Sequence, residues 1–532
     1  MLKDGKIWVG NTAEGQELYL LPNMANRHGL VAGATGTGKT VTLKVMAETF
    51  SDMGVPVFMA DVKGDVAGLY AAGEDSADMQ ERIAKFKLAD AGFAYQGYPV
   101  QLWDIYGQKG IPLRSTISEM GPLLLSRILQ LNDLQSDILS VIFRIADDQN
   151  LLLIDTKDLK SMINYVEENA KTFAPTYGKI SPASLGVITR AIVTLETAGG
   201  EQFFAEPALN VTDFLQVAAG GRGMINILDA AELVNDGRMY STFLLWMLSE
   251  LYDMLPEVGD ADKPKLVFFF DEAHLLFKET SKTLLEKIEQ VVKLVRSKGV
   301  GVYFCTQNPR DIPDSVLAQL GNKVQHGLRA YTPADQKAVK AAAESFRENE
   351  AFDTYDTILN LGTGEAIVSF LDEKGIPAVC EKAYILPPQS RMGALTDAER
   401  DTCIKSSMAY SRYATMVDND SAYEFLMRKG LEDEANALKE KEAAAAAKEA
   451  EKQAKEEAKA KEKAEKEAAK QAEKEKKKKL QAAKQVGSSI TGTVGREVGK
   501  QVGKNFGKFG QTLGGNIGAQ LGRSILGTLF KS

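Results

Sequence analysis

One eight-residue stretch near the amino terminus, Gly33 to Thr40 with the sequence GATGTGKT, restricts the fold more than any other part of the chain. It matches the pattern G-x-x-x-x-G-K-[ST], in which glycines let the backbone wrap around phosphate oxygens and offer them N–H groups. An apolar run, HGLVA at 28–32, precedes it, and a helical stretch, VTLKVMAETF at 41–50, follows it. This order of strand, glycine-rich loop and helix predicts a phosphate-binding loop in an α/β protein.

The residue types in this loop assign a role to individual positions. Lys39 is expected to reach the β- and γ-phosphates of a nucleotide, and the Thr40 hydroxyl is expected to ligate Mg²⁺. ATP and Mg²⁺ are therefore the predicted ligands. The predicted nucleotide-binding segment consists of Gly33, Ala34, Thr35, Gly36, Thr37, Gly38, Lys39, Thr40 and the residue that follows them, Val41.

A pair of acidic residues, Asp271 and Glu272, follows the apolar run KLVFFF at 265–270. An aspartate at the carboxyl end of a buried strand can hold Mg²⁺, and the glutamate after it is placed to polarise an attacking water. The letters DEAH at 271–274 also name a group of helicases, but the interval from Lys39 to Asp271 is much longer than one domain of that group usually provides. We therefore interpret the pair as the acids of an ATP hydrolase and His274 as a structural residue at a helix start.

Two further polar residues end strand-like runs. Gln307 ends GVYFCTQ at 301–307 and is predicted to sense the γ-phosphate and orient water, with a capping or loop role as the alternative. Asp61 ends VPVFMAD at 55–61. It is expected either near the magnesium site or in a purely structural role.

Apolar runs without strict alternation recur as far as residue 390 and predict parallel strands buried on both faces. The predicted fold class is α/β, with a RecA-like P-loop NTPase core of the ASCE type, a helical insertion and a C-terminal extension. The predicted segments are 1–72 and 221–390 for the two parts of the core, 73–220 for the mostly helical insertion, 391–430 for short helices, 431–485 for a charged arm and 486–532 for a glycine-repeat tail.

The arm and the tail have unusual compositions. Between Leu438 and Leu480 there is no Leu, Ile, Val, Met or aromatic residue, which excludes a leucine-type coiled-coil seam. Alanine and Glu–Lys pairs favour a solvated helix, with a disordered linker as the alternative. In the tail, apolar–glycine pairs such as Val494-Gly495 recur mostly every four positions. This pattern predicts either order only against a partner or a membrane surface, or a flexible tail.

Composition limits the partners and the cellular location that we expect for the protein. The formal net charge is −8, so a nucleic-acid partner would need a local basic surface. Cys305, Cys380 and Cys403 lie far apart and predict neither a disulfide framework nor a metal site. We found no apolar run long enough for an ordinary membrane helix and no apolar leader segment. The expected location is the cytoplasm, with peripheral attachment to the inner membrane left open.

Taken in order, these motifs resemble the HerA/FtsK group of P-loop ATPases, and within it the HerA-like bacterial subfamily of YjgR-type proteins. The resemblance covers roughly residues 1–430. It is carried by NRHGLVAGATGTGKT (26–40), ADVKGDVAGL (60–69), RSTISEMGPLLLSRIL (114–129), FFFDEAHLLF (268–277) and VRSKGVGVYFCTQNPRDIPDSVLAQLGNKVQHGLRAY (295–331). HerA proper carries a β-barrel before its phosphate loop, whereas 32 residues precede Gly33 here, so the nuclease partnership of HerA is not carried over.

The resemblance implies a homo-oligomer, a hexameric ring, with ATP between neighbouring subunits and an arginine of one subunit at the γ-phosphate of the next. Arg296 occupies the matching position, and Arg329 and Arg144 are the alternatives. The resemblance also implies a motor that translocates DNA. Two other functions stay open: a secretion-like or scaffold ATPase that is tethered to a protein or membrane partner through the tail, and a nucleotide-gated assembly factor.

Overall fold

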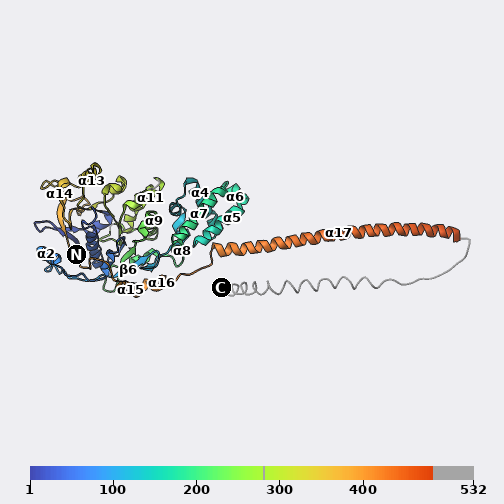
Figure 1. The fold of residues 1–532 in the computed structure, drawn as a ribbon, viewed down its shortest axis with the longest axis horizontal. Coiled ribbons are helices and arrows are strands. Elements are labelled where there is room, and N and C mark those ends of the chain that lie inside the picture. Colours follow the sequence, from blue (N-terminus) through green and yellow to red (C-terminus); the bar gives the residue numbers. More distant parts are fainter. Residues whose placement is uncertain (260, 279–281, 483–532) are drawn as a thin grey trace. The chain divides into compact units, whose positions relative to one another are not determined.

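The computed structural model describes residues 1–259, 261–278 and 282–482 (Figure 1). The chain divides into two compact units, Met1–Asp433 and a second one from Glu434 onward. The glycine-repeat tail predicted at 486–532 lies outside the described residues.

A single sheet of 13 strands, counted over the described residues, runs through the first unit. Its order is β1-β2-β13-β12-β11-β4-β10-β9-β5-β8-β6-β7, with β3 paired to β2. The strands from β11 through β7 in this order are parallel to their neighbours, and the others are antiparallel. The strands are β1 Leu2–Lys3, β2 Lys6–Asn11, β3 Glu17–Leu20, β4 Gly29–Ala32, β5 Val57–Asp61, β6 Val100–Asp104, β7 Ile111–Pro112, β8 Ile225–Asp229, β9 Leu266–Phe270, β10 Val300–Thr306, β11 Asn322–His326, β12 Glu365–Ser369 and β13 Glu381–Ile385.

The central strands are buried along their whole length, as the apolar runs predicted. All residues of β9 and β10 are buried, which parallel strands between two helical layers require. Gly29 in β4 faces the ring of Tyr303 in β10, and a Cβ at position 29 would lie 2.5 Å from that ring. The Tyr303 hydroxyl donates a hydrogen bond to the Ala25 carbonyl at 2.9 Å. This close packing fixes β4, the strand that leads into the phosphate-binding loop, against β10.

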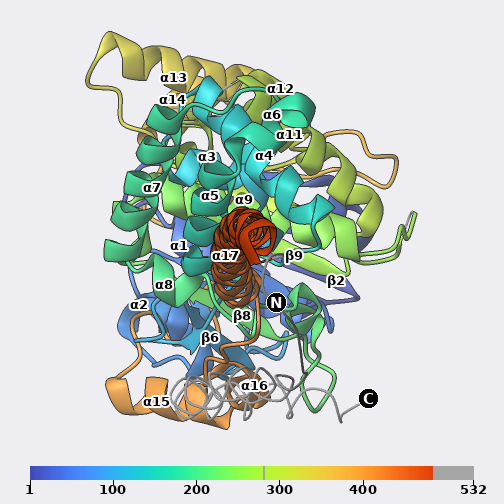
Figure 2. The same cartoon turned by 90° about the vertical axis from the view of Figure 1, so that its right-hand side faces the viewer.

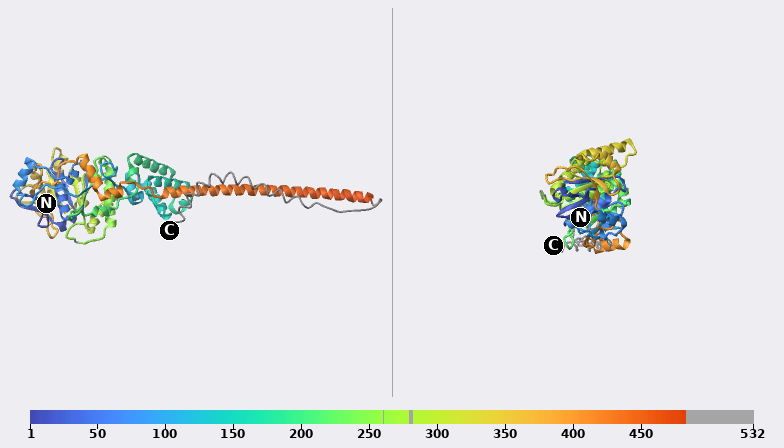
Figure 3. Two further views of the ribbon diagram at one scale, coloured as in Figure 1. Left: turned by 90° about the horizontal axis from the view of Figure 1, so that it is seen from below. Right: turned by 90° about the vertical axis from the view of Figure 1, so that its left-hand side faces the viewer.

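Helices cover the sheet and form a separate group at one end of this unit. Figures 1 and 3 show α4 to α7 together at that end, with α2, α13 and α14 at the other. The α-helices are α1 Lys39–Asp52, α2 Ala77–Lys85, α3 Ile117–Ile128, α4 Asp133–Asp148, α5 Thr156–Glu168, α6 Ala170–Tyr177, α7 Pro182–Thr197, α8 Gly200–Phe203, α9 Gly237–Met254, α10 His274–Phe277, α11 Lys282–Val295, α12 Asp314–Leu317, α13 Pro333–Glu344, α14 Thr354–Asn360, α15 Asp397–Ser406, α16 Met408–Tyr413 and α17 Ala422–Ala482. The 3-10 helices are η1 Pro22–Arg27, η2 Val66–Tyr70, η3 Val211–Leu215, η4 Leu233–Asn235, η5 Arg296–Lys298 and η6 Pro309–Asp311.

Two of the predicted segments differ from the structure, one in its content and one in its boundary. The segment 73–220, predicted as a mostly helical insertion, contributes β6 and β7 to the main sheet, where β6 pairs with β8. The amphipathic helices from α3 to α7 dominate the apolar pattern of this segment and hide its short buried strands. The segment predicted as short helices at 391–430 ends inside α17, because that helix begins at Ala422.

The helices after β13 return to the far edge of the sheet. Figure 2 shows α15 and α16 beside β6, and the contacts place α15 on β6 and α16 on β7. Arg114 donates to the Tyr413 carbonyl at 2.7 Å, and the Tyr413 hydroxyl donates to Asp213 at 2.5 Å. These bonds tie the end of the first unit to its middle.

Helix α17 has 61 residues, and from Leu431 to Lys459 every residue is exposed. In the described ranges, no helix combines the length and the apolar character that crossing a bilayer requires.

The buried carboxylate of Glu48 in α1 should be a strong determinant of stability. It accepts hydrogen bonds from the N–H groups of Gln389 and Ser390, at 2.9 and 3.0 Å, and from the Ser390 hydroxyl. Glu48→Ala leaves these buried donors without an acceptor and should lower the free energy of unfolding by about 2–4 kcal/mol. Urea unfolding followed by tryptophan fluorescence measures this, with the exposed Glu81→Ala as control. Equal midpoints for the two variants would contradict the prediction.

Candidate nucleotide-binding site

The loop predicted from GATGTGKT connects β4 to α1. Gly33, Gly36 and Gly38 have φ angles of 153°, 78° and 114°, values that residues with a Cβ rarely adopt. A Cβ at position 33 would also lie 2.5 Å from the Cβ of His326. Backbone conformation and packing therefore both require glycine at Gly33.

Backbone hydrogen bonds hold the loop between three neighbouring segments. They run from the N–H of Gly33 to the carbonyl of Thr306 (3.2 Å), from Ala34 to Gly327 (2.9 Å) and from Gly364 to Thr37 (3.0 Å). The N–H groups in the first turn of α1 have no partner within the helix, and they stand at the positive end of its dipole. A loop that is held open in front of such a helix end fits a phosphate chain.

Lys39 lies across this loop. Its ammonium donates to the carbonyl oxygens of Gly33 at 2.6 Å and Ala34 at 3.1 Å, so the charge is held over the space that the loop surrounds. The side chain of Thr40, the predicted magnesium ligand, is partly exposed. Val41 has no polar side-chain atom, so only its backbone can bind the nucleotide by hydrogen bonds.

The acid pair follows β9 on the same edge of the sheet. Glu272 adopts φ 47°, and its N–H donates to the Asp271 carboxylate at 2.9 Å. Tyr240 donates its hydroxyl to the Asp271 carbonyl at 2.7 Å. Burial raises the pKa of the Asp271 carboxyl and the Glu272 carboxylate adds to this effect, whereas Lys39 opposes it. Asp271 thus lies within electrostatic reach of the loop.

The structure brings Gln307 to Glu272. The Gln307 amide donates to the two Glu272 carboxylate oxygens at 3.1 and 3.4 Å, and the Thr35 hydroxyl donates to the Gln307 carbonyl oxygen at 3.4 Å. His274, interpreted from the sequence as a structural residue, also contacts Glu272, with Nδ1 3.3 Å from Oε2. The acid, the amide and the loop therefore form one connected group.

His326 supports the loop from below, and sequence reasoning gave it no role. Its Nδ1 lies 2.9 Å from the Glu365 carbonyl and must donate there, so Nε2 accepts the hydrogen bond from the Thr42 hydroxyl at 2.8 Å. Burial lowers the pKa of His326 to about 4, which keeps this tautomer neutral near pH 7. No local pattern reveals the contact, because Thr42 and His326 lie far apart in the sequence.

Asp61 holds the turn that follows β5, and a place near the magnesium site stays a prediction. Its carboxylate accepts from the N–H groups of Gly64 at 2.7 Å and Ala67 at 2.9 Å, which fixes the turn after β5. Burial raises the pKa of Asp61 to about 6.

The three candidate arginines lie in different places. Arg296 begins η5, before the amino end of β10, whereas Gln307 follows the carboxyl end of that strand. Arg329 is exposed after β11, at the same edge as the loop. Arg144 pairs with Asp148 within α4. A role for any of them in a neighbouring subunit stays a prediction.

The residues present fit a magnesium nucleotide. Thr40 offers a hydroxyl and Asp271 a carboxylate, and both follow parallel strands that end at one edge of the sheet. No cluster of three or more His, Cys, Asp and Glu side chains suited to a metal occurs within 1–259, 261–278 and 282–482. Mg²⁺ that is shared with phosphates needs only one or two protein ligands, so this donor set suits it.

Comparison with known proteins identifies the family. The family model described as "Helicase HerA-like C-terminal" matches residues 6–521. The chain belongs to this HerA-like family. The match extends beyond the predicted limit near residue 430, so the arm and most of the tail lie within it.

Individual relatives are distant. The HerA-like chain is 22% identical over 383 residues to the DNA double-strand break repair helicase HerA of Sulfurisphaera tokodaii, covering 69% of this chain and 67% of that protein. It is 22% identical over 376 residues to HerA of Saccharolobus solfataricus, covering 69% and 66%. It therefore spans about two thirds of the length of these relatives. Among solved structures, it is similar to the bacterial conjugative coupling protein TrwB, with a TM-score of 0.49, 15% identity and coverage of 74% of this chain and 93% of that one.

Acid should destabilise the support beneath the loop. The pKa of His326 is near 6.5 when unfolded and about 4 when folded, so between these values the unfolded chain binds one more proton at this residue. Its contribution to stability is complete above about pH 6.5 and is lost as the pH falls toward about 4. His326→Gln should therefore reduce the slope of unfolding free energy against pH by about 1.4 kcal/mol per pH unit in this window. Urea titrations between pH 7 and 4 measure the slope, and an unchanged slope would contradict the prediction.

Proposed function

We propose that the protein is an ATP-hydrolysing motor of a ring-forming, hexameric type that translocates double-stranded DNA. The observation that carries the hydrolytic part is the group of Glu272, Gln307 and Thr35 beside the phosphate-binding loop. The Gln307 amide holds the Glu272 carboxylate beside the loop. A carboxylate held in this way is suited to act as the general base for an attacking water, and less suited to bind a second substrate.

Each side chain at the site has a separate role in ATP hydrolysis. Glu272 accepts the proton of the attacking water, and Gln307 holds the carboxylate in place through its amide. Lys39 and the N–H groups of the loop stabilise negative charge as it develops on the phosphoryl oxygens. Thr40 and Asp271 would hold Mg²⁺, which neutralises charge on the β- and γ-phosphates when bound.

The DNA part draws on the relatives and on one surface. The two curated relatives are named as DNA double-strand break repair helicases. Because the net charge is −8, DNA contact needs a local basic surface. Our candidate for this surface is a groove of about 790 Å³ next to α13. Its lining contains four cations, Arg310, Lys323, Lys337 and Lys340, and two acids, Asp314 and Glu344, the second of which pairs with Lys340.

The ring and its trans-acting arginine follow from the family resemblance, with Arg296 and Arg329 as the candidates. Attachment to a protein or membrane partner concerns the tail at 486–532, outside the described residues, and stays a prediction.

Hydrolysis should separate cleanly from nucleotide binding. Glu272→Gln removes the base but keeps the shape of the side chain, so steady-state ATP hydrolysis should fall at least about 100-fold while ATP still binds. Gln307→Ala should lower hydrolysis by about 10-fold, because Glu272 loses its positioning amide. Colorimetric phosphate release and equilibrium binding measure the two quantities, with Glu81→Gln as a surface control. Full hydrolysis by Glu272→Gln would refute the assigned base.

DNA should stimulate the same activity. At low salt, where phosphate contacts are strongest, double-stranded DNA should raise ATP turnover several-fold in the wild type and leave Glu272→Gln inactive. Lys337→Glu should abolish the stimulation without changing basal turnover, whereas Lys374→Glu, in the exposed turn before β13, should retain it. If DNA does not change ATP turnover, the DNA part of the proposal is wrong and the ATPase part stands. The protein partner would then be sought at the tail.

A further inference from the structure

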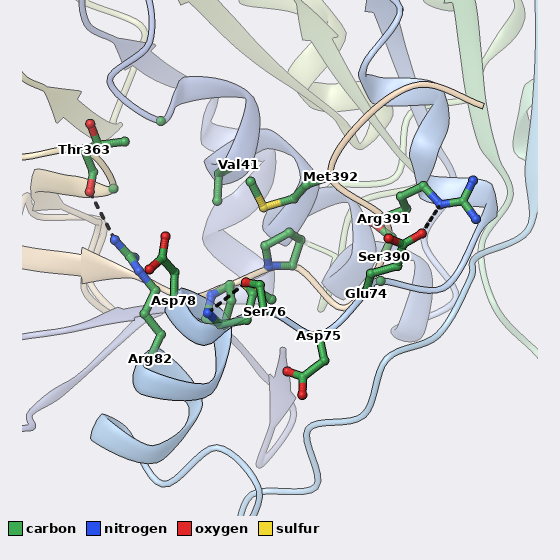
Figure 4. A pocket seen from close by; sticks show the side chains of 16 residues that line it. Val41, Glu74, Asp75, Ser76, Asp78, Arg82, Thr363, Ser390, Arg391 and Met392 are labelled. Carbon is green, nitrogen blue, oxygen red and sulfur yellow. Dashed lines mark hydrogen bonds and ion pairs between the residues drawn. The ribbon is translucent and has the colours of Figure 1, made fainter. Parts of the chain in front are cut away.

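A cavity of about 420 Å³ lies beside the start of α1 and has no role in the function described above. Gly38 and Val41 line one side of it, the segment around α2 lines another, and the segment 387–392 after β13 lines a third (Figure 4). Thr363 and Gly364, which precede β12, complete it. The phosphate-binding loop and the cavity therefore share Gly38.

The position of the cavity relative to the acids indicates what it receives. In the sheet order β11-β4-β10-β9, the loop follows β4, the acids follow β9, and β12, next to the cavity, pairs with β11. A triphosphate with its terminal phosphate near Glu272 and Gln307 must direct its other end away from them, past Gly38 and the first turn of α1. We propose that this cavity binds the base of the nucleotide and that Asp78 selects adenine. The proposal rests on the ATP-dependent function.

The apolar side of the cavity suits a flat ring. Figure 4 shows the side chains of Val41 and Met392 next to each other, and Pro387 and Pro388 also line the space. Met392 is 60% exposed, so its side chain contributes little to the core. The thioether of methionine is flexible and polarisable and makes favourable contacts with aromatic rings. Met392 therefore has the chemistry to pack on a purine.

The polar side of the cavity contains three acids, two of which are already engaged. Glu74 pairs with Arg391 at 3.5 Å. Asp75 accepts hydrogen bonds from the side chains of Gln80 and Tyr95. Asp78 makes no hydrogen bond or ion pair with any residue that the structure describes, and it leaves two acceptor oxygens available. A carboxylate accepts from the amino group at C6 of adenine and repels the carbonyl oxygen that guanine carries there.

Arg82 fixes the helix that carries Asp78. It lies one turn further along α2 and donates to the carbonyl oxygens of Thr363 and Ile385, both at 3.1 Å. Helix α2 has no fully buried residue, and Ile83 is its partly buried contact with the core, so these bonds add to a small packing surface. Arg82 is thus a positioning residue for the base and joins α2 to the turn that also binds the loop through Gly364.

Calorimetric titration of the full-length protein in Mg²⁺ buffer tests the proposal with three ligands. ATP carries the amino group, purine riboside triphosphate lacks it, and tripolyphosphate has no base. The wild type should bind ATP about 10-fold more tightly than purine riboside triphosphate, and Asp78→Ala should reduce this ratio to about 1. Met392→Ala should weaken both nucleotides about 5-fold. Neither variant should change the affinity for tripolyphosphate.

Matched controls separate this proposal from the function on which it rests. Glu81→Gln, on α2 but outside the cavity, should keep the wild-type ratio. If ATP and tripolyphosphate bind and Asp78→Ala and Met392→Ala leave the nucleotide affinities unchanged, the base lies elsewhere and the proposal is wrong while the ATPase stands. If neither ATP nor tripolyphosphate binds to the wild type, the proposed function fails with it.

Discussion

Parallel pairing of β4 with both β10 and β11 is the constraint on which the rest of this site depends. The register sets Ala32 opposite Thr306 on one side and opposite Gln325 on the other. The residues that follow each strand therefore emerge at one edge, where the loop hydrogen-bonds to Thr306 and Gly327. A shift of β11 by one residue would turn His326 to the other face and remove the support beneath Gly33.

Burial distributes charge around this edge in an uneven way. His326 is buried, and burial lowers its pKa to about 4, so it adds no positive charge near neutral pH. Asp271 and Glu272 are adjacent carboxyls, and Asp271 is disfavoured as an anion by its burial. The carboxyl groups of Asp271 and Glu272 thus lie on the β9 side of the edge, and the Lys39 ammonium lies over the loop. This asymmetry favours a ligand that combines a divalent cation with phosphates.

The sequence predicts the parts of the molecule that are specified locally. The loop from Gly33 to Thr40 and the acid pair Asp271 and Glu272 each occupy one short run, and each directly follows a buried strand, β4 and β9 respectively. The strands β6 and β7 escaped prediction because strong helical periodicity surrounds them. His326 and Arg82 could not be assigned because their partners, Thr42 for His326 and Ile385 for Arg82, come from distant parts of the chain. Asp78 could not be assigned because the cavity beside it is lined by segments that are far apart in the sequence. Such contacts depend on the assembled sheet, and a linear pattern does not contain them.

Position 272 must adopt a left-handed backbone conformation and must also carry the carboxylate that we assign to hydrolysis. At φ 47° glycine or asparagine would have less backbone strain, whereas a residue with a longer side chain is strained by about 1 kcal/mol. Variants chosen only for resistance to heat would therefore tend to replace the residue that hydrolysis needs. Thermal stability and ATP turnover therefore compete at this single position. Directed evolution for thermal stability would have to hold Glu272 fixed to preserve ATP hydrolysis.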